Sequence, residues 1–421
     1  MRLPALVVTR TLILGLLLGS TAPSLAKPTA GPRAPLPAAA TAPVAEVTPP
    51  GHDFTPVGHA LFAVAACGGG AAPADVPARL MADHCKKVND TQDEYKGRWV
   101  TRGRTFFAEH VPASIPKKVV YPFAGGDLST ALTVYPDADE ITTMSLEPAG
   151  DPRTLAALIG EVGEVGAGKG KRAAASSTLA SALSTIAKEL RFLYRVNFSN
   201  TMNMIGAMRG GQLPTQLTFG LSALKVHGYE VVALRYFKLG ADGQIEYLTD
   251  ADVAAAPDPR KGRAEARNKV FANAEVRFRK AGGRVQIYRH IQVNLDDTHL
   301  GADPRVIKHL DAKGPVAAMT KAASYLLSWD SFSTIRDYLT RNVQWMVSDA
   351  TGVPTKFGTK AGFTYETYGR FKVPHIGANS AAMKDWARMF AAQPFRKIDF
   401  RFGYYDGSPD HTNHLIIMHK P

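Results

Sequence analysis

The chain has 421 residues, of which 45% are hydrophobic, and its formal net charge is +13. This length and apolar content exclude a disordered or fibrous protein, and they suffice for one large domain or two closely packed ones. Two basic clusters, Lys169–Arg172 and Arg260–Arg267, lack interleaved aromatic residues, which argues against nucleic acid. They indicate either solvated loops or contact with an anionic envelope polymer or lipid headgroup.

The N-terminus predicts export from the cytoplasm. Arg2 and Arg10 precede the apolar stretch Thr11–Gly19, and Ser24-Leu25-Ala26 supplies small residues where a signal peptidase cleaves. We therefore expect a signal peptide over residues 1–26, cleaved after Ala26. The apolar stretch is shorter than the roughly 20 residues that cross a bilayer, so no transmembrane segment is expected after cleavage. The predicted location is secreted or periplasmic.

Residues 27–51 are rich in Pro and Ala, a composition that predicts a disordered tether. Cys67 and Cys85 are the two cysteines of the chain, and in an oxidising compartment they predict a disulfide. Although His84 adjoins Cys85, the spacing does not match a zinc site, and no metal is expected.

The elements predict an α/β fold with an N-terminal helical cap. Residues 52–116 have helical character, and the rest, 117–421, reads as one α/β domain. Its first part is strand Val119–Tyr121, helix Leu128–Val134 and strand Glu140–Leu146. A strand, a helix and a second strand in this order indicate a Rossmann-like βαβ unit of a parallel sheet.

The remaining pattern predicts a mixed sheet with flanking helices. Hairpin turns join β-rich runs in the middle of the chain, which favours antiparallel pairing there. Later segments with apolar residues at helical spacing predict helices, and the C-terminus predicts three strands, the last two as a hairpin. The expected helices are 173–208, 213–227, 317–327 and 333–347, and the expected strands are 229–239, 244–248, 274–279, 285–295, 363–371, 397–405 and 414–419.

The turn after the first strand is the candidate ligand site. Gly125 and Gly126 permit close approach of the backbone, and Asp127 stands where a helix begins and can cap it. Glu147 follows the next strand, where dinucleotide and adenosyl cofactor folds place the carboxylate that holds a ribose. The glycine pattern GxGxxG is absent, so no cofactor is expected.

Aromatic residues complete this candidate site. Tyr121 and Phe123 precede the glycine turn, and Tyr404 and Tyr405 are C-terminal aromatics suited to a sugar or peptide ligand. An enzymatic alternative uses Asp127 and Glu147 as general acid and base with a histidine, His375 or His290. The ordinary alternative is that both carboxylates are helix and turn caps.

Four segments resemble an uncharacterised family of bacterial envelope proteins. They are YPFAGGD at 121–127, SLEPAG at 145–150, KAASYLLSWDSFSTIRDYL at 321–339 and DATGVP at 349–354. The chain differs from that family's pattern at Gly126, where Pro is usual, and at Ala350-Thr351, where Asp-Ser is usual. The resemblance implies a shared fold and a recurring site but no reaction.

These observations predict an envelope or periplasmic protein that binds a small ligand or glycan at the Tyr121–Asp127 and Glu147 turns. Two alternatives stay open at this point. One is a hydrolase of envelope glycan, lipid or peptide that uses Asp127 and Glu147. The other is a non-catalytic scaffold with a decayed methyltransferase-like core.

Overall fold

The computed structural model describes residues 48–70, 72–163, 169–197, 213–373, 381–403 and 413–421. The expected signal peptide and most of the expected tether lie outside these residues. The end of the tether is already attached to the sheet, because the buried Arg235 donates a hydrogen bond from Nε to the carbonyl of Pro49. All described residues belong to one compact unit, Ala45–Pro421.

The described residues form a single sheet in the order β4-β3-β5-β6-β2-β1-β7-β8-β10-β9. The central strands β6, β2, β1, β7 and β8 run parallel, and the outer pairings are antiparallel. The predicted α/β class with a mixed sheet is confirmed. The strands are β1 Lys118–Tyr121, β2 Glu140–Ser145, β3 Glu230–Leu239, β4 Ile245–Tyr247, β5 Asn273–Arg279, β6 Gln286–Gln292, β7 Val316–Thr320, β8 Val343–Ser348, β9 Thr364–Gly369 and β10 His414–His419.

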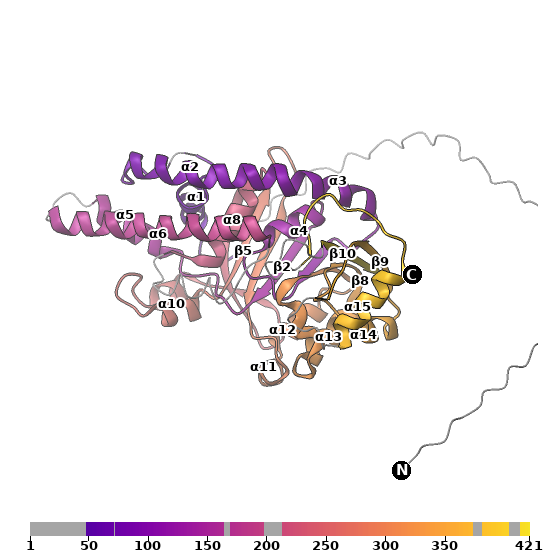
Figure 1. Cartoon of the computed structure of the whole chain (residues 1–421). Coiled ribbons are helices and arrows are strands. Elements are labelled where there is room, and N and C mark those ends of the chain that lie inside the picture. The colour runs from indigo at the N-terminus through magenta and orange to yellow at the C-terminus, as the bar shows by residue number, and fades with distance from the viewer. Residues whose placement is uncertain (1–47, 71, 164–168, 198–212, 374–380, 404–412) are drawn as a thin grey trace, which may run out of the picture. The chain divides into compact units, whose positions relative to one another are not determined.

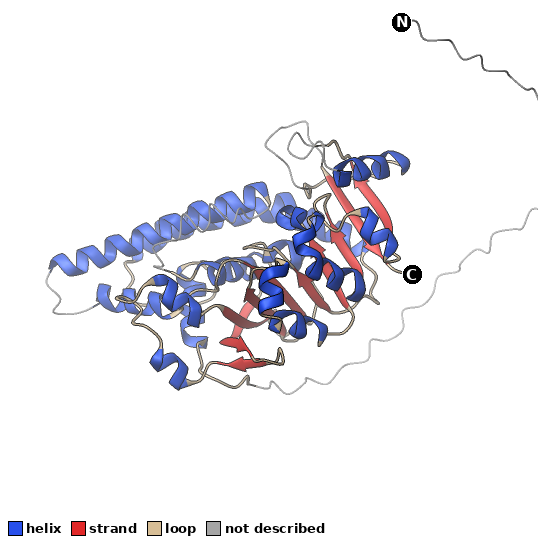
Figure 2. Ribbon diagram, turned by 90° about the horizontal axis from the view of Figure 1, so that it is seen from below, coloured by secondary structure: helices blue, strands red, loops and turns tan. Residues whose placement is uncertain are grey.

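Helices cover both faces of this sheet, which gives three layers (Figures 1 and 2). The alternation of side chains along the strands explains the arrangement: Val119 and Tyr121 point into one hydrophobic core and Val120 into the other. One core is covered by α1 Thr55–Val64, α2 Ala78–Tyr95, α3 Thr101–His110, α4 Leu128–Val134, α5 Arg153–Gly163, α6 Lys169–Val196 and α8 Thr215–Val226, and the other by α11 Asp297–Ala302, α12 Arg305–Asp311, α13 Ser333–Asn342, α14 Thr355–Lys360 and α15 Ala381–Ala392.

The predicted disulfide is confirmed. Cys67 follows α1 and bonds to Cys85 of α2, with a Cα–Cα distance of 5.5 Å and a sequence separation of 18. Closing a loop of this size stabilises a fold by about 3 kcal/mol in the chain-entropy model. The bond therefore fixes α1 against α2, which packs along α6 on the same face of the sheet.

Two predicted helices near the C-terminus differ from the structure, the first throughout its β7 part and the second at its end. Residues 317–327, expected as a helix, form β7 followed by the 3₁₀ helix η2 Ala322–Ser328. The expected helix 333–347 ends at Asn342, and β8 follows. Short apolar runs buried on both faces of a sheet carry no alternation, so periodicity does not separate them from buried helices.

The expected C-terminal hairpin is also wrong. The described residues 397–403 form no strand, and β10 pairs antiparallel with β8 on one side and with β9 on the other. The last strand is therefore inserted between two earlier ones. This insertion, rather than a terminal hairpin, completes the edge of the sheet.

Candidate functional site

The topology defines a switch point between β1 and β7. From β1 the chain continues to β2 on one side, and β7 lies on the other side of β1. In open sheets of this kind ligands bind beyond the carboxyl ends of the strands where the order reverses. Asp127 follows β1 at this edge, and Lys321 directly follows β7.

The turn after β1 has an unusual backbone. Phe123 and Gly125 both have positive φ, 58° and 52°. The N–H of Ala124 donates to the carbonyl of Met144 on β2, at 2.9 Å, which attaches the turn to the neighbouring strand. Asp127 then caps α4 as predicted, with its side chain accepting from the N–H of Thr130. Phe123, a non-glycine residue in the left-handed region, is held in a conformation that costs free energy.

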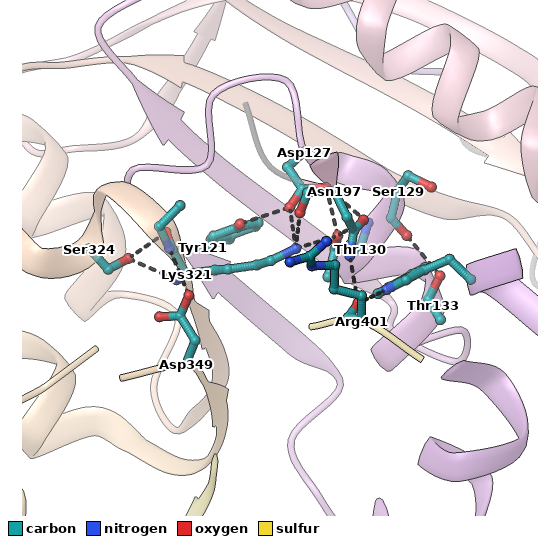
Figure 3. Close-up of polar contacts among 12 residues, drawn as sticks. Tyr121, Asp127, Ser129, Thr130, Thr133, Asn197, Lys321, Ser324, Asp349 and Arg401 are labelled. Atoms are coloured by element: carbon teal, nitrogen blue, oxygen red, sulfur yellow. Dashed lines mark hydrogen bonds and ion pairs between the residues drawn. The ribbon is translucent and has the colours of Figure 1, made fainter. Parts of the chain in front are cut away.

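A buried ion pair joins the two sides of the switch point (Figure 3). Lys321 Nζ lies 3.5 Å from Asp127 Oδ2, and both side chains are almost fully inaccessible to solvent. Asp127 also accepts hydrogen bonds from the hydroxyls of Tyr121 at 3.1 Å and Thr130 at 2.7 Å. Lys321 donates in addition to Thr130 Oγ1 at 3.4 Å and to the carbonyl of Asn197. Every oxygen of this carboxylate is therefore engaged within the protein.

Burial dominates the electrostatics of this pair. It raises the pKa of Asp127, although the positive charge of Lys321 acts in the opposite direction. It likewise lowers the pKa of Lys321, against the effect of the Asp127 carboxylate. Both shifts favour the neutral forms, so removing these groups from water costs more than their mutual attraction returns.

Aromatic rings close the space above Lys321. Its ammonium lies 5.1 Å from the ring centre of Phe402 and 5.8 Å from that of Trp99. Trp99 stacks on Tyr95, with ring centres 5.5 Å apart, and both rings are buried. These contacts exclude water from Asp127 and Lys321.

Glu147 is the second candidate carboxylate, and its surroundings differ. Its side chain is buried, at 3% exposure for the residue, beside Leu146, which is 52% exposed. Within the described part of the chain, neither carboxylate oxygen of Glu147 has a hydrogen-bond partner. A buried carboxylate without partners is costly, and such groups mark strained or functional positions.

The backbone of Glu147, in contrast, is firmly held. Its carbonyl accepts a hydrogen bond from Nε2 of His290 at 2.7 Å, and its N–H donates to Ser145 Oγ at 3.3 Å. The Thr143 hydroxyl lies 3.2 Å from the other ring nitrogen of His290. Burial lowers the pKa of His290 to about 4, so the ring is neutral at pH 7 and donates only through Nε2. His290 therefore fixes the position of Glu147.

The structure does not join the two predicted carboxylates directly. Among the described residues no hydrogen bond or ion pair connects Asp127 with Glu147, although β1 and β2 are neighbours. Four cavities bounded by described residues have volumes of about 260 to 870 Å³, and neither carboxylate lines any of these four. Their use as a catalytic pair stays a prediction.

The remaining predicted site residues are distributed as follows. Tyr121 is buried and bonded to Asp127, Phe123 packs edge-on against Phe332 with ring centres 5.8 Å apart, and Gly126 is buried in the turn. His375, Tyr404 and Tyr405 lie outside the described residues.

Sequence reasoning missed Lys321 and Asp349. Asp349 follows β8, and its carboxylate accepts from the N–H groups of Ala322 and Thr351 at 3.2 and 2.8 Å. A charged residue directly after an apolar run is the signal that marks both positions. Because the runs before them were assigned to helices, that signal was not recognised.

No metal site or membrane span is seen in the described part of the chain. There, no cluster of three or more His, Cys, Asp or Glu side chains could hold a metal ion. None of the helices there is both long and apolar enough to cross a bilayer. Comparison of the chain with protein families, curated proteins and solved structures gave no match.

Proposed function

We propose that the protein is exported and binds a small polyhydroxylated ligand, a sugar or a nucleoside, at the carboxyl ends of β1 and β2. The observation that carries this proposal is the buried Glu147 carboxylate, whose two oxygens have no partner in the described part of the chain. Two adjacent hydroxyls of a ligand can donate to two oxygens of one carboxylate. The end of the second strand is where doubly wound folds hold such a diol.

Export is supported by the disulfide together with the N-terminal sequence. Disulfides persist in oxidising compartments and are rare in the cytoplasm, and Cys67 and Cys85 form one. The predicted signal peptide at residues 1–26 gives the same location, secreted or periplasmic.

The contacts of Asp127 support binding in preference to hydrolysis. Its carboxylate already accepts from Thr130, Tyr121 and Lys321, and it is buried beneath aromatic rings. A general acid or base must come within hydrogen-bond reach of the substrate. In the proposal Asp127 holds the switch point together, and Glu147 contacts the ligand.

The scaffold alternative is supported by the strand order. The order β6-β2-β1-β7-β8-β10-β9, with β10 antiparallel to both neighbours, forms a doubly wound core and is compatible with the methyltransferase-like core of this alternative. Likeness at the level of the fold carries no reaction. A nucleoside is accordingly among the ligands to test, while a scaffold with no ligand is the outcome if none binds.

At the cluster Arg260–Arg267, two of the basic side chains are engaged within the protein, which weakens the case for contact with an anionic envelope polymer there. Arg260 pairs with Glu161 at 2.6 Å, and Arg267 is buried and donates to the carbonyl of Gly262. These two charges serve the fold of this loop. The polymer contact stays a prediction.

The test is a thermal-shift screen with nucleosides, monosaccharides and envelope glycan fragments, followed by calorimetric titration. A ligand at 100 times its Kd stabilises the fold by about 2.7 kcal/mol, which gives a rise of several degrees in Tm. We expect Glu147→Gln to weaken binding at least tenfold, because an amide presents one acceptor where the carboxylate presents two.

The matched control for this test is Glu109→Gln, since Glu109 is exposed on α3. It should bind like the wild type. Binding that is unaffected by Glu147→Gln would place the ligand elsewhere, and the absence of any shift across the panel would favour the scaffold.

A further inference from the structure

One of the four cavities lies beside the amino end of β1, whereas Asp127 and Glu147 follow the carboxyl ends of β1 and β2. It has a volume of about 550 Å³ and is bounded by α3, the amino end of β1 and the segment at the end of α4. Its walls are mainly apolar and include Phe107, Val111, Ile115, Val119 and Val134. This volume lies within the range of about 300–1,000 Å³ that is typical of small-molecule sites.

Positive charge surrounds this apolar space. Arg104, Lys117 and Lys280 line the cavity, and Asp137 is the one acidic residue among its lining residues. In the described part of the chain none of these three cations forms an ion pair with a carboxylate. Guanidinium and ammonium groups beside an apolar wall are suited to an amphiphilic anion.

Arg104 is held in place without a counterion. One of its terminal nitrogens donates to Nδ1 of His227 at 2.7 Å, and Nε2 of His227 lies 3.0 Å from Ser129 Oγ. Burial, reinforced by the charge of Arg104, puts the pKa of His227 well below its ordinary value, so the ring is neutral. Nε of Arg104 is buried and has no partner among the described residues. The charge of Arg104 is therefore fixed but not neutralised.

We propose that this cavity binds a single fatty acid anion, with its chain against the apolar wall and its carboxylate on Arg104. The apolar lining would bury the hydrocarbon chain of the fatty acid. The three cations, with one acidic residue among the lining, would attract its carboxylate. This site is independent of the one at Glu147.

The test is calorimetric titration of the full chain with monomeric hexadecanoate, tetradecanoate and hexadecanol. We expect one site per chain. Removing two methylenes should weaken binding about fifteenfold if both are buried, and the alcohol should bind at least tenfold more weakly than the acid.

Two variants place the site. Arg104→Gln should weaken the binding of hexadecanoate at least tenfold. Ala108→Trp should block this binding, since Ala108 lines the cavity and is exposed. Arg102→Gln, on the same helix but outside this cavity, should bind normally. Glu147→Gln should also bind normally, which separates this proposal from the proposed function.

Equal affinity for the acid and the alcohol would overturn the proposal. So would wild-type binding by both Arg104→Gln and Ala108→Trp, or adsorption to phosphatidylglycerol vesicles without binding of monomeric hexadecanoate.

Discussion

Lys321→Met is expected to lower the free energy of unfolding by about 3–5 kcal/mol, the usual cost of breaking a buried ion pair. The reason is that Asp127 would keep a buried carboxylate without its cation, beneath Trp99 and Phe402. Urea denaturation at pH 7 measures the loss. Lys360→Met, at the exposed end of α14, is the control and should change stability by less than about 0.5 kcal/mol.

The double variant Asp127→Asn with Lys321→Met tests the cause. Burial shifts the pKa of both groups toward the neutral form. A neutral pair should therefore be more stable than Lys321→Met alone, with a coupling of about 1–3 kcal/mol. Purely additive losses in the double-mutant cycle would show that packing, not the uncompensated charge, explains the effect.

Loss of stability in acid is the second large effect. Glu140 on β2 is bonded to Lys313 and Arg289, and the Thr142 hydroxyl donates to it at 3.0 Å. Burial alone would raise the pKa of Glu140, but the two cations outweigh it and lower the pKa to about 2. Because the folded-state value lies below the unfolded one, the stabilisation is present above about pH 4.5 and is lost as pH falls toward 2.

The size of this effect is about 3 kcal/mol, since each unit of pKa difference corresponds to 1.36 kcal/mol. Urea denaturation at pH 5, 4 and 3 measures it. Glu140→Gln should be less stable at pH 5 and should lose less stability between pH 5 and 3 than the wild type. A variant with the wild-type slope would assign the acid sensitivity to other groups, such as the buried His290.

The local features of the candidate site could be predicted from the sequence. The glycine turn, the cap at Asp127 and the β1–α4–β2 unit each depend on a few adjacent residues with distinct preferences. The same holds for the disulfide, because the chain contains two cysteines.

The partners of those residues could not be predicted. Lys321 lies 194 positions from Asp127, and the two meet only because β7 pairs with β1. The strand Val316–Thr320 is short and buried throughout, so its sequence shows neither alternation nor a helical face. An error in that one element concealed the cation at the switch point.

The insertion of β10 between β8 and β9 has a similar origin. Neighbouring strands usually follow one another in sequence, which favoured a terminal hairpin. The observed order depends on packing against α13 to α15 on one face of this edge and against α3 on the other, and no local sequence pattern predicts these long-range contacts.

The central claim is that Asp127 serves the fold and Glu147 serves a ligand. The most direct test is calorimetric unfolding of Glu147→Gln and Asp127→Asn without ligand. Glu147→Gln should melt at or above the wild-type Tm, since a buried carboxylate without partners is replaced by a neutral amide. Asp127→Asn should melt several degrees lower. Equal losses in both variants would contradict the claim and make Glu147 a structural residue.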